Sequence, residues 1–125
     1  MNIPEDLIYT EEHEWVRVTE KNAIVGITDF AQSQLGDIIF LELPDVDDKI
    51  IAGEPFGEIE AVKTVSELYA PVDGTVIEVN NNLEDFPEKV NQDCYWDGLI
   101  IKINPENKID KEDLLDHKQY SNIIE

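Results

Sequence analysis

One short pattern recurs along this chain and restricts the folds open to it. Segments of four to six residues alternate between apolar and polar positions, are rich in β-branched residues, and are separated by turn-forming residues. The segments are 16–19, 23–28, 38–43, 75–80 and 99–103, and the turns include Glu20-Lys21-Asn22, Pro44-Asp45, Ala52-Gly53, Asp73-Gly74 and Asn80-Asn81-Asn82. Period-two alternation is typical of strands. Many short strands with regular turns predict a sandwich or barrel, not a parallel α/β sheet.

Two of these strands carry specific predictions about which side chains share a face. The predicted faces are Ile39, Leu41 and Leu43 in one strand, and Thr75, Ile77 and Val79 in another. Because side chains alternate between the two faces of a strand, each set is expected to point to one side of its sheet.

Helices are expected to be short and peripheral. Asp29 can cap a helix through Gln34 that stops at Gly36, Asp110 can cap residues 111–115, and Asp116 can cap a last helix with Gln119 three residues on. In that last helix Tyr120, Ile123 and Ile124 lie on one face, which can dock on the sheets. No Pro- or Ser-rich linker divides the chain, so we expect one domain over residues 1–125, with a helical segment at about 110–124 packed on it.

The charge excludes several classes of partner. Nine Lys and Arg residues oppose 29 Asp and Glu residues, giving a formal net charge of −20, while the 42% of hydrophobic residues suffices for a packed core. Nucleic acid and anionic membrane surfaces are disfavoured because both select clustered cations. We expect protein partners with basic docking surfaces; the alternative is that the charge serves solubility alone.

Cysteine usage and the N-terminal residues indicate the compartment. The single cysteine, Cys94, excludes an intramolecular disulfide and a thiolate zinc cluster. The first seven residues carry Glu5 and Asp6 and no cation, unlike a secretory signal or an Arg-rich transit peptide. No apolar run exceeds four residues, so no membrane span is expected. We therefore expect a cytoplasmic monomer.

Motifs of common enzyme classes are missing: there is no Gly-rich phosphate loop, nucleophile elbow or HExxH. His13 lies between Glu12 and Glu14, where a metal pair is conceivable, but a solvated strand edge is the favoured interpretation. His117 is expected at the start of the last helix, with no chemical role. Cys94 has no basic neighbour to activate its thiol, so we interpret it as a small apolar residue.

Lys63 is the only basic residue between Lys49 and Lys89. A strand-forming arm, 52–60, leads to it, and a second arm, 70–78, leads away, which predicts a hairpin with Lys63 at its tip. An isolated solvated lysine is the plain alternative. A hairpin tip can enter the cleft of another enzyme, which favours a modification site that loses its charge on amide formation.

The residues around Lys63 resemble a known family. They read Glu58-Ile59-Glu60-Ala61-Val62-Lys63-Thr64-Val65-Ser66-Glu67-Leu68-Tyr69-Ala70-Pro71-Val72-Asp73-Gly74, similar to the lipoyl-lysine hairpin of the glycine cleavage system H proteins. Further signatures of that family, in its order and spacing, are Glu12-His13-Glu14-Trp15-Val16, residues 25–32, Leu35-Gly36-Asp37-Ile38 and Pro87-Glu88-Lys89-Val90-Asn91. The resemblance covers nearly the whole chain.

The resemblance implies a mainly β, barrel-sandwich hybrid fold of the lipoyl-domain kind, with short peripheral helices and a C-terminal helix. It implies a carrier in glycine catabolism and one-carbon metabolism, not an enzyme, with lipoate covalently bound to Lys63. In that scheme a pyridoxal-phosphate glycine decarboxylase loads an aminomethyl group onto the lipoyl arm. A tetrahydrofolate-dependent aminomethyltransferase then takes up the one-carbon unit, and a dihydrolipoyl dehydrogenase with FAD and NAD reoxidises the arm. A lipoate-attaching enzyme is the fourth implied partner.

Two further residues enter through the resemblance. The family's loaded arm folds into a cleft, and the matching positions here, Glu14 and Glu67, would be its polar lining near the amine, since carboxylates favour an ammonium group. Surface solvation is the alternative for both. One segment departs from the family: Cys94-Tyr95-Trp96-Asp97-Gly98-Leu99 stands where Pro-Tyr-Gly-Glu-Gly-Trp is usual, which bears on the packing of the last strand or on a partner contact there.

Related carriers fit less well. A biotin carrier usually has Met on both sides of its lysine, where this chain has Val62 and Thr64. A lipoyl domain of a 2-oxoacid dehydrogenase is usually shorter and linked to a catalytic domain. Two alternatives stay open: a lipoate relay or regulatory lipoyl scaffold for 2-oxoacid dehydrogenases, and an interaction protein without modification.

Overall fold

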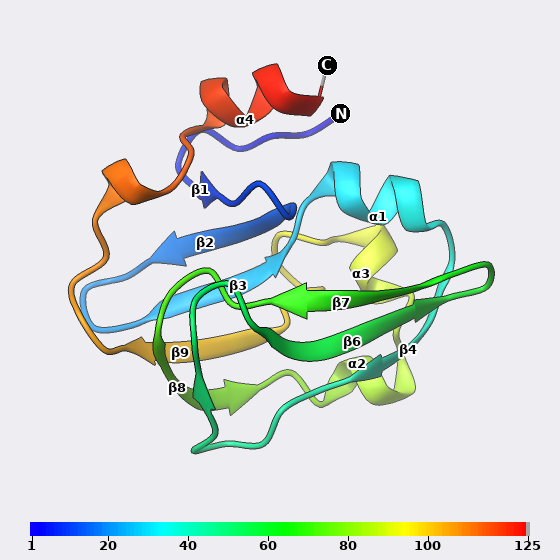
Figure 1. The fold of residues 1–125 in the computed structure, drawn as a ribbon. Helices are drawn as coiled ribbons and strands as arrows, with labels where there is room; N and C mark the ends of the chain where they lie inside the picture. The colour runs from blue at the N-terminus through cyan, green and yellow to red at the C-terminus, as the bar shows by residue number, and fades with distance from the viewer. Residues whose placement is uncertain (125) are drawn as a thin grey trace.

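Two antiparallel sheets and several short helices form the protein (Figure 1). The structure is a computed structural model that describes residues 1–124. Its strands are β1 (Ile8–Tyr9), β2 (Glu14–Val18), β3 (Ala23–Ile27), β4 (Ile38–Glu42), β5 (Lys49–Ile50), β6 (Pro55–Ala61), β7 (Val65–Tyr69), β8 (Gly74–Val79) and β9 (Ile101–Pro105). Its helices are α1 (Asp29–Leu35), α2 (Asn82–Asp85), α3 (Lys89–Gln92), the 3₁₀ turn η1 (Lys111–Asp113) and α4 (His117–Ile124). This arrangement confirms the prediction of a mainly β fold with short helices and a C-terminal helix.

The larger sheet has six strands in the order β1-β2-β3-β9-β8-β5, and the smaller has three in the order β4-β6-β7. Trp15 on β2 lies directly opposite Gly26 on β3. A Cβ atom at Gly26 would lie 2.6 Å from the Trp15 ring, so the indole can cover β3 only because this residue has no side chain. The Trp15 Nε1–H donates to the Cys94 carbonyl at 3.0 Å, which fixes the indole in place.

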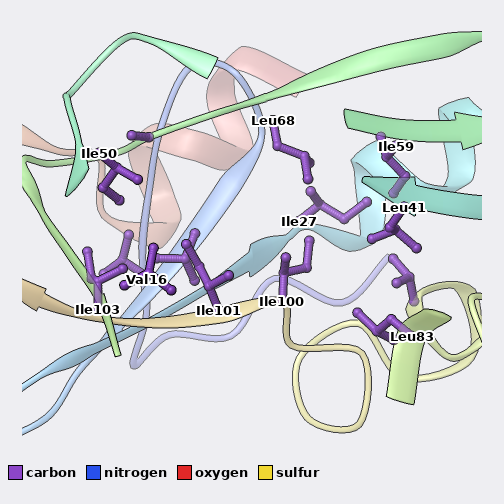
Figure 2. Packing of buried hydrophobic residues seen from close by; sticks show 14 of the residues in the cluster. Val16, Ile27, Leu41, Ile50, Ile59, Leu68, Leu83, Ile100, Ile101 and Ile103 are labelled. Carbon is purple, nitrogen blue, oxygen red and sulfur yellow. The ribbon is translucent and has the colours of Figure 1, made fainter. Parts of the chain in front are cut away.

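The main core lies between the two sheets (Figure 2). Most of its side chains come from inward positions of the two sheets, and Leu83 of α2 and Ile100, just before β9, complete it. They include Val16, Ile27, Leu41, Ile50, Ile59, Leu68, Leu83, Ile100, Ile101 and Ile103. Burying one such side chain contributes about 1.5–3 kcal/mol. The smaller sheet, which carries Lys63, is therefore held to the larger one by apolar burial across its inner face.

A second apolar cluster fixes the C-terminal helix. It contains Leu7, Tyr9, Trp15, Cys94, Tyr95 and Tyr120, all buried. Tyr120 of α4 stacks on Tyr9 of β1, with ring centroids 4.7 Å apart and planes 9° from parallel. The predicted capping of α4 is confirmed, since Gln119 N–H donates to Asp116 Oδ1 (2.8 Å) and Asp116 N–H donates to Gln119 Oε1 (2.9 Å). Ile124 packs on the cluster, but the prediction that Ile123 docks is wrong, because Ile123 is exposed.

The predicted face of β4 is wrong because the strand contains a bulge. The register with β6 shifts between Ile38 and Phe40, so one extra residue stands on β4. Ile38 and Leu41 point into the core, whereas Ile39 and Phe40 are 49% and 52% exposed. An irregularity of register between Val76 and Glu78 changes β8 in the same way. There Val76 is buried, and the predicted set Thr75, Ile77 and Val79 is only partly so.

The predicted helix ends are close to the observed ones. Thr28, not Asp29, is the N-cap of α1, and its side chain accepts the Ala31 N–H. Gly36 ends the helix as predicted, at a φ of 79° that favours glycine. Asp110 caps the turn at Lys111 as predicted, although this turn is a 3₁₀ helix of three residues. The helix α2 begins in the Asn80–Asn82 run, which predicted only a turn, and α3 was not predicted.

Candidate functional site

Lys63 lies at the tip of the hairpin formed by β6 and β7, as predicted, where the two strands extend furthest from the rest of the chain in Figure 1. Residues 62–64 connect the strands, and Lys63 is exposed together with Val62 and Val65. The predicted return arm, 70–78, is wrong: β7 begins at Val65, and residues 74–79 form β8 in the larger sheet. After a three-residue turn the residues that follow directly pair with the first strand. The segment that begins at Val65 therefore pairs with β6, and the segment 70–78 does not.

The tip is anchored to the rest of the smaller sheet. Ala61 N–H donates to the Thr64 carbonyl at 2.8 Å and closes the turn, and Val62 N–H donates to the Asp37 carbonyl at 3.1 Å. Asn91 of α3 then fixes the start of β4, because its Oδ1 accepts the Ile38 N–H at 3.0 Å. Lys63 is thus an exposed side chain on a fixed backbone, which suits a group that must be presented to other proteins.

Glu14 occupies a different environment from the other predicted site residues. It begins β2, and only 2% of it is exposed. Its Oε1 accepts the Thr10 hydroxyl at 2.7 Å, and its Oε2 accepts the Tyr69 N–H from β7 at 3.4 Å. Both Glu14 and Tyr69 line a cavity of about 260 Å³ between the two sheets' edges and the segment before α4. The cavity is also lined by Tyr9, Thr10, Glu11, Glu12, Gly53, Ala70, Pro71, Asp113, Leu114 and Leu115.

Burial raises the pKa of Glu14 to about 7. The hydrogen bonds from Thr10 and Tyr69 oppose that rise but do not cancel it. A carboxyl group whose pKa lies near neutrality, inside a cavity, ionises when a cation arrives to compensate the buried charge. The site can therefore hold an ammonium group.

Glu67 lies near this cavity but does not line it. It is exposed on β7, two residues before Tyr69, and points to the outer face of the smaller sheet. The neighbouring Glu67 carboxylate is the main cause that raises the pKa of the Tyr69 phenol. The structure thus joins Glu14 and Glu67 through Tyr69, a residue that the sequence reasoning missed. Its only sequence signal was its place at the end of the hairpin motif.

Three other predicted residues can now be placed. His13 is not at a solvated strand edge: it is half-buried, and its Nδ1 lies 2.8 Å from the Tyr120 hydroxyl. His117 begins α4, as predicted. Cys94 is buried, and burial raises the pKa of its thiol to about 12, in agreement with the prediction of an unreactive residue.

The unusual segment 94–99 packs around Arg17. The Arg17 guanidinium carbon lies 3.9 Å from the Trp96 ring centroid and 4.9 Å from that of Trp15, and its Nη2–H donates to the Tyr95 carbonyl at 3.0 Å. Trp96 itself is 62% exposed. It also lines a larger cavity, of about 550 Å³, with residues of β8 and with Lys89 and Lys102. None of the residues that line this cavity belongs to the Lys63 hairpin.

Residues 1–124 contain neither a metal-binding cluster nor a helix able to span a membrane. Over these residues no group of three or more His, Cys, Asp or Glu side chains is placed to hold a metal ion. Within the same range no helix has the length and apolar character needed to cross a membrane.

Comparison with known proteins identifies the family. The sequence model described as "Glycine cleavage H-protein" matches residues 7–125. The glycine cleavage system H protein of Geobacillus kaustophilus is 53% identical over 124 residues, covering 99% of this chain and 98% of that one. That of Bacillus pumilus is 54% identical over 120 residues, covering 96% and 94%.

A solved structure agrees with the sequence comparison. The crystal structure of a glycine cleavage system H protein from Mycobacterium marinum matches with a TM-score of 0.89 at 36% identity, covering 96% of this chain and 97% of that one. Sequence and structure agree over nearly the full length, so the chain belongs to the glycine cleavage H-protein family.

Proposed function

We propose that this protein carries lipoate in amide linkage to Lys63 Nζ and shuttles an aminomethyl group on it, with residues 1–125 acting as one carrier domain. The protein is a component of the glycine cleavage system and not itself an enzyme. The observation that supports the attachment site best is the position of Lys63, exposed at the tip of an anchored hairpin. In amide formation the lysine nitrogen attacks an activated lipoyl carbonyl, and the activating group leaves.

The lipoyl arm supplies the sulfur that accepts and releases the aminomethyl group. The partners that the function requires are a pyridoxal-phosphate glycine decarboxylase, a tetrahydrofolate-dependent aminomethyltransferase and an FAD- and NAD-dependent dihydrolipoyl dehydrogenase, together with a lipoate-attaching enzyme. This chain's own part is to present Lys63 to each of them in turn.

Glu14 and Glu67 serve the loaded arm in this proposal. The buried Glu14 carboxyl lines a cavity at the far end of β7 from Lys63 and suits the aminomethyl ammonium group. Glu67 lies on β7, outside the cavity and close to the Tyr69 phenol. Enclosing the adduct would also protect it from hydrolysis.

The experiment is an intact-mass measurement of the full chain, produced with lipoate supplied and a lipoate-attaching enzyme present. We expect one lipoyl adduct on the wild type, none on Lys63→Arg, and an unchanged adduct on the control Lys49→Arg, another exposed lysine. An adduct that persists on Lys63→Arg, or one missing from all three, contradicts the attachment site.

The second candidate function, a lipoate relay or scaffold for 2-oxoacid dehydrogenases, uses the same lysine. The lipoylated chain is expected to support exchange of bicarbonate with the glycine carboxyl group when mixed with glycine decarboxylase. No exchange, together with normal lipoyl transfer to a 2-oxoacid dehydrogenase, would favour the relay.

A further inference from the structure

The backbone at His13 is held in an unfavourable conformation. Its φ is 71°, in the left-handed region, which costs a residue with a side chain roughly 1–2 kcal/mol. The turn around it is closed by hydrogen bonds: His13 N–H donates to the Thr10 carbonyl (3.2 Å), and Thr28 N–H donates to the His13 carbonyl (3.0 Å). This turn immediately precedes Glu14, so its geometry decides in which direction the Glu14 side chain leaves the backbone.

The His13 side chain is tied to the C-terminal helix. Its Nδ1 lies 2.8 Å from Tyr120 Oη, which in turn lies 2.7 Å from Thr28 Oγ1. Phe30 covers the imidazole, with ring centroids 4.8 Å apart. Tyr120 and Thr28 are both fully buried. One hydroxyl on α4 thus joins the turn before β2 to the start of α1.

Two donor orders satisfy the hydrogen bonds that join Thr28, Tyr120 and His13. In one, Thr28 Oγ1 accepts the Ala31 N–H and donates to Tyr120 Oη, and Tyr120 Oη donates to His13 Nδ1. In the other, His13 Nδ1–H donates to Tyr120 Oη, which donates to Thr28 Oγ1. Burial lowers the pKa of His13, in agreement with the neutral form.

The Glu14 carboxylate is weakly held by its own partners. One of its two side-chain hydrogen bonds is 3.4 Å long, and the Thr10 hydroxyl that makes the other also accepts the Glu14 N–H at 3.1 Å. Thr10 and Glu14 therefore move with the turn as a unit. The position of the carboxylate depends on what holds the turn, and the link from His13 to Tyr120 does so from outside the cavity.

We propose that Tyr120, acting through His13, is a positioning residue. It keeps the Glu14 carboxyl group pointing into the cavity of about 260 Å³ that Glu14 and Tyr69 line. The role of Glu14 toward the arm rests on the proposed function, whereas the positioning itself concerns only this chain. The same C-terminal segment also forms a wall of the cavity through Asp113, Leu114 and Leu115. The C-terminal helix then contributes to the site by positioning Glu14, although it is far from Lys63 along the chain.

The test is the pH titration of the Glu14 side-chain carboxyl by ¹³C NMR in the full chain without lipoate. The titratable groups that face Glu14 are Glu12 on the same turn, Tyr69 on β7 and Tyr120 on α4, with Tyr9, Glu11 and Asp113 also at the cavity. Tyr120→Phe removes only the hydroxyl and keeps the ring on Tyr9. We expect the pKa of Glu14 to fall by about half a unit or more toward its ordinary value, because the freed carboxyl reaches water.

Tyr95→Phe is the matched control. The Tyr95 hydroxyl is also bonded at both sides, donating to the Asn2 carbonyl at 2.6 Å and accepting the Asp29 N–H at 3.0 Å, but it makes no bond to His13. We expect it to lower stability without changing the Glu14 titration. An unchanged Glu14 pKa in folded Tyr120→Phe would overturn the positioning role.

A second variant covers the case in which Tyr120→Phe does not fold. His13→Ala breaks the same link from its half-buried end, and the same shift of the Glu14 titration is expected. An unchanged titration in His13→Ala overturns the proposal equally. Because the titration needs no lipoyl group, its failure is distinct from a failure of the mass measurement at Lys63.

Discussion

At the residue scale, burial of the Glu14 carboxyl group costs stability, and the proposed function gives a reason for that cost. A carboxyl group that is 2% exposed and has no cationic partner would be better protonated, and burial raises its pKa to about 7. Replacing it by an apolar residue would remove that cost and, under the proposed function, also the carboxylate that would hold the aminomethyl ammonium group. A buried carboxyl group of this kind is expected for a binding group and not for a structural one.

This environment gives Glu14 a pH signature. Its pKa in the folded state is above that in the unfolded chain, so its contribution to stability is complete below about pH 4.5 and is lost as the pH rises through about 7. We expect the free energy of unfolding to lose roughly 3 kcal/mol from this residue across that window. Glu14→Gln should remove this loss, measured by urea unfolding at several pH values.

Glu67→Gln is the control for that measurement, since Glu67 is exposed on β7 of the smaller sheet. Its pH dependence of stability is expected to follow the wild type between pH 5 and 8. A Glu14→Gln curve parallel to the wild-type curve would mean that Glu14 reaches water in the folded state.

His13 shows the limit of sequence reasoning at this scale. Two flanking glutamates suggested a solvated edge, and nothing in the local sequence indicates a partner 107 residues away. Lys63 was predictable because its signal is local: a lone cation between two strand-forming arms. Glu14 could be named only through the family resemblance, because its burial depends on β7 and on the segment before α4.

At the scale of elements, the outer face of the smaller sheet carries two distinct rows. In one row Phe40, Glu60 and Val65 are directly opposite one another, and in the next Glu42, Glu58 and Glu67 are. The second row places three exposed carboxylates side by side on adjacent strands. Like charges in directly opposite positions are destabilising, so this row weakens the hairpin that carries Lys63.

Removing the middle charge of that row should stabilise the protein. Glu58→Gln is expected to raise the free energy of unfolding by about 0.5–1 kcal/mol at low salt, with a smaller gain at high salt because of screening. Thermal unfolding at two ionic strengths measures this. The control is Glu54→Gln, an exposed glutamate outside the row, and an equal effect there would show that only the net charge matters.

Strand β4 shows why the presence of a strand could be predicted while the side chains on its inner face could not. The alternation in residues 38–43 correctly predicted a strand, but a bulge at Ile39 turned two apolar side chains outward. The position of the bulge depends on how β4 pairs with β6. The local sequence of β4 does not show which strand it pairs with or in which register.

At the scale of the whole molecule, the charge of −20 is almost entirely unpaired. Within residues 1–124 a single ion pair is found, Lys102 Nζ to Glu78 Oε2 at 2.9 Å. Unpaired surface charge of one sign creates a field that extends about 10 Å at 0.1 M salt and accelerates the approach of partners of opposite sign.

Association with glycine decarboxylase is therefore expected to depend on salt. The association rate should fall several-fold between 50 mM and 500 mM NaCl while the dissociation rate changes little, measured by surface plasmon resonance. An association rate that does not change over this range of salt would mean that the charge serves solubility alone.

The sequence by itself determined most of the strands, the turn at Lys63, the caps at Asp110 and Asp116 and the family, because each depends on residues within a few positions or on a pattern read along the chain. Only the tertiary structure decided that Glu14 is buried, that Tyr69 lies between Glu14 and Glu67, and that Tyr120 reaches His13. These contacts join opposite sheets and the two ends of the chain. They exist because apolar burial brings distant segments together, and that outcome is not encoded at any single position.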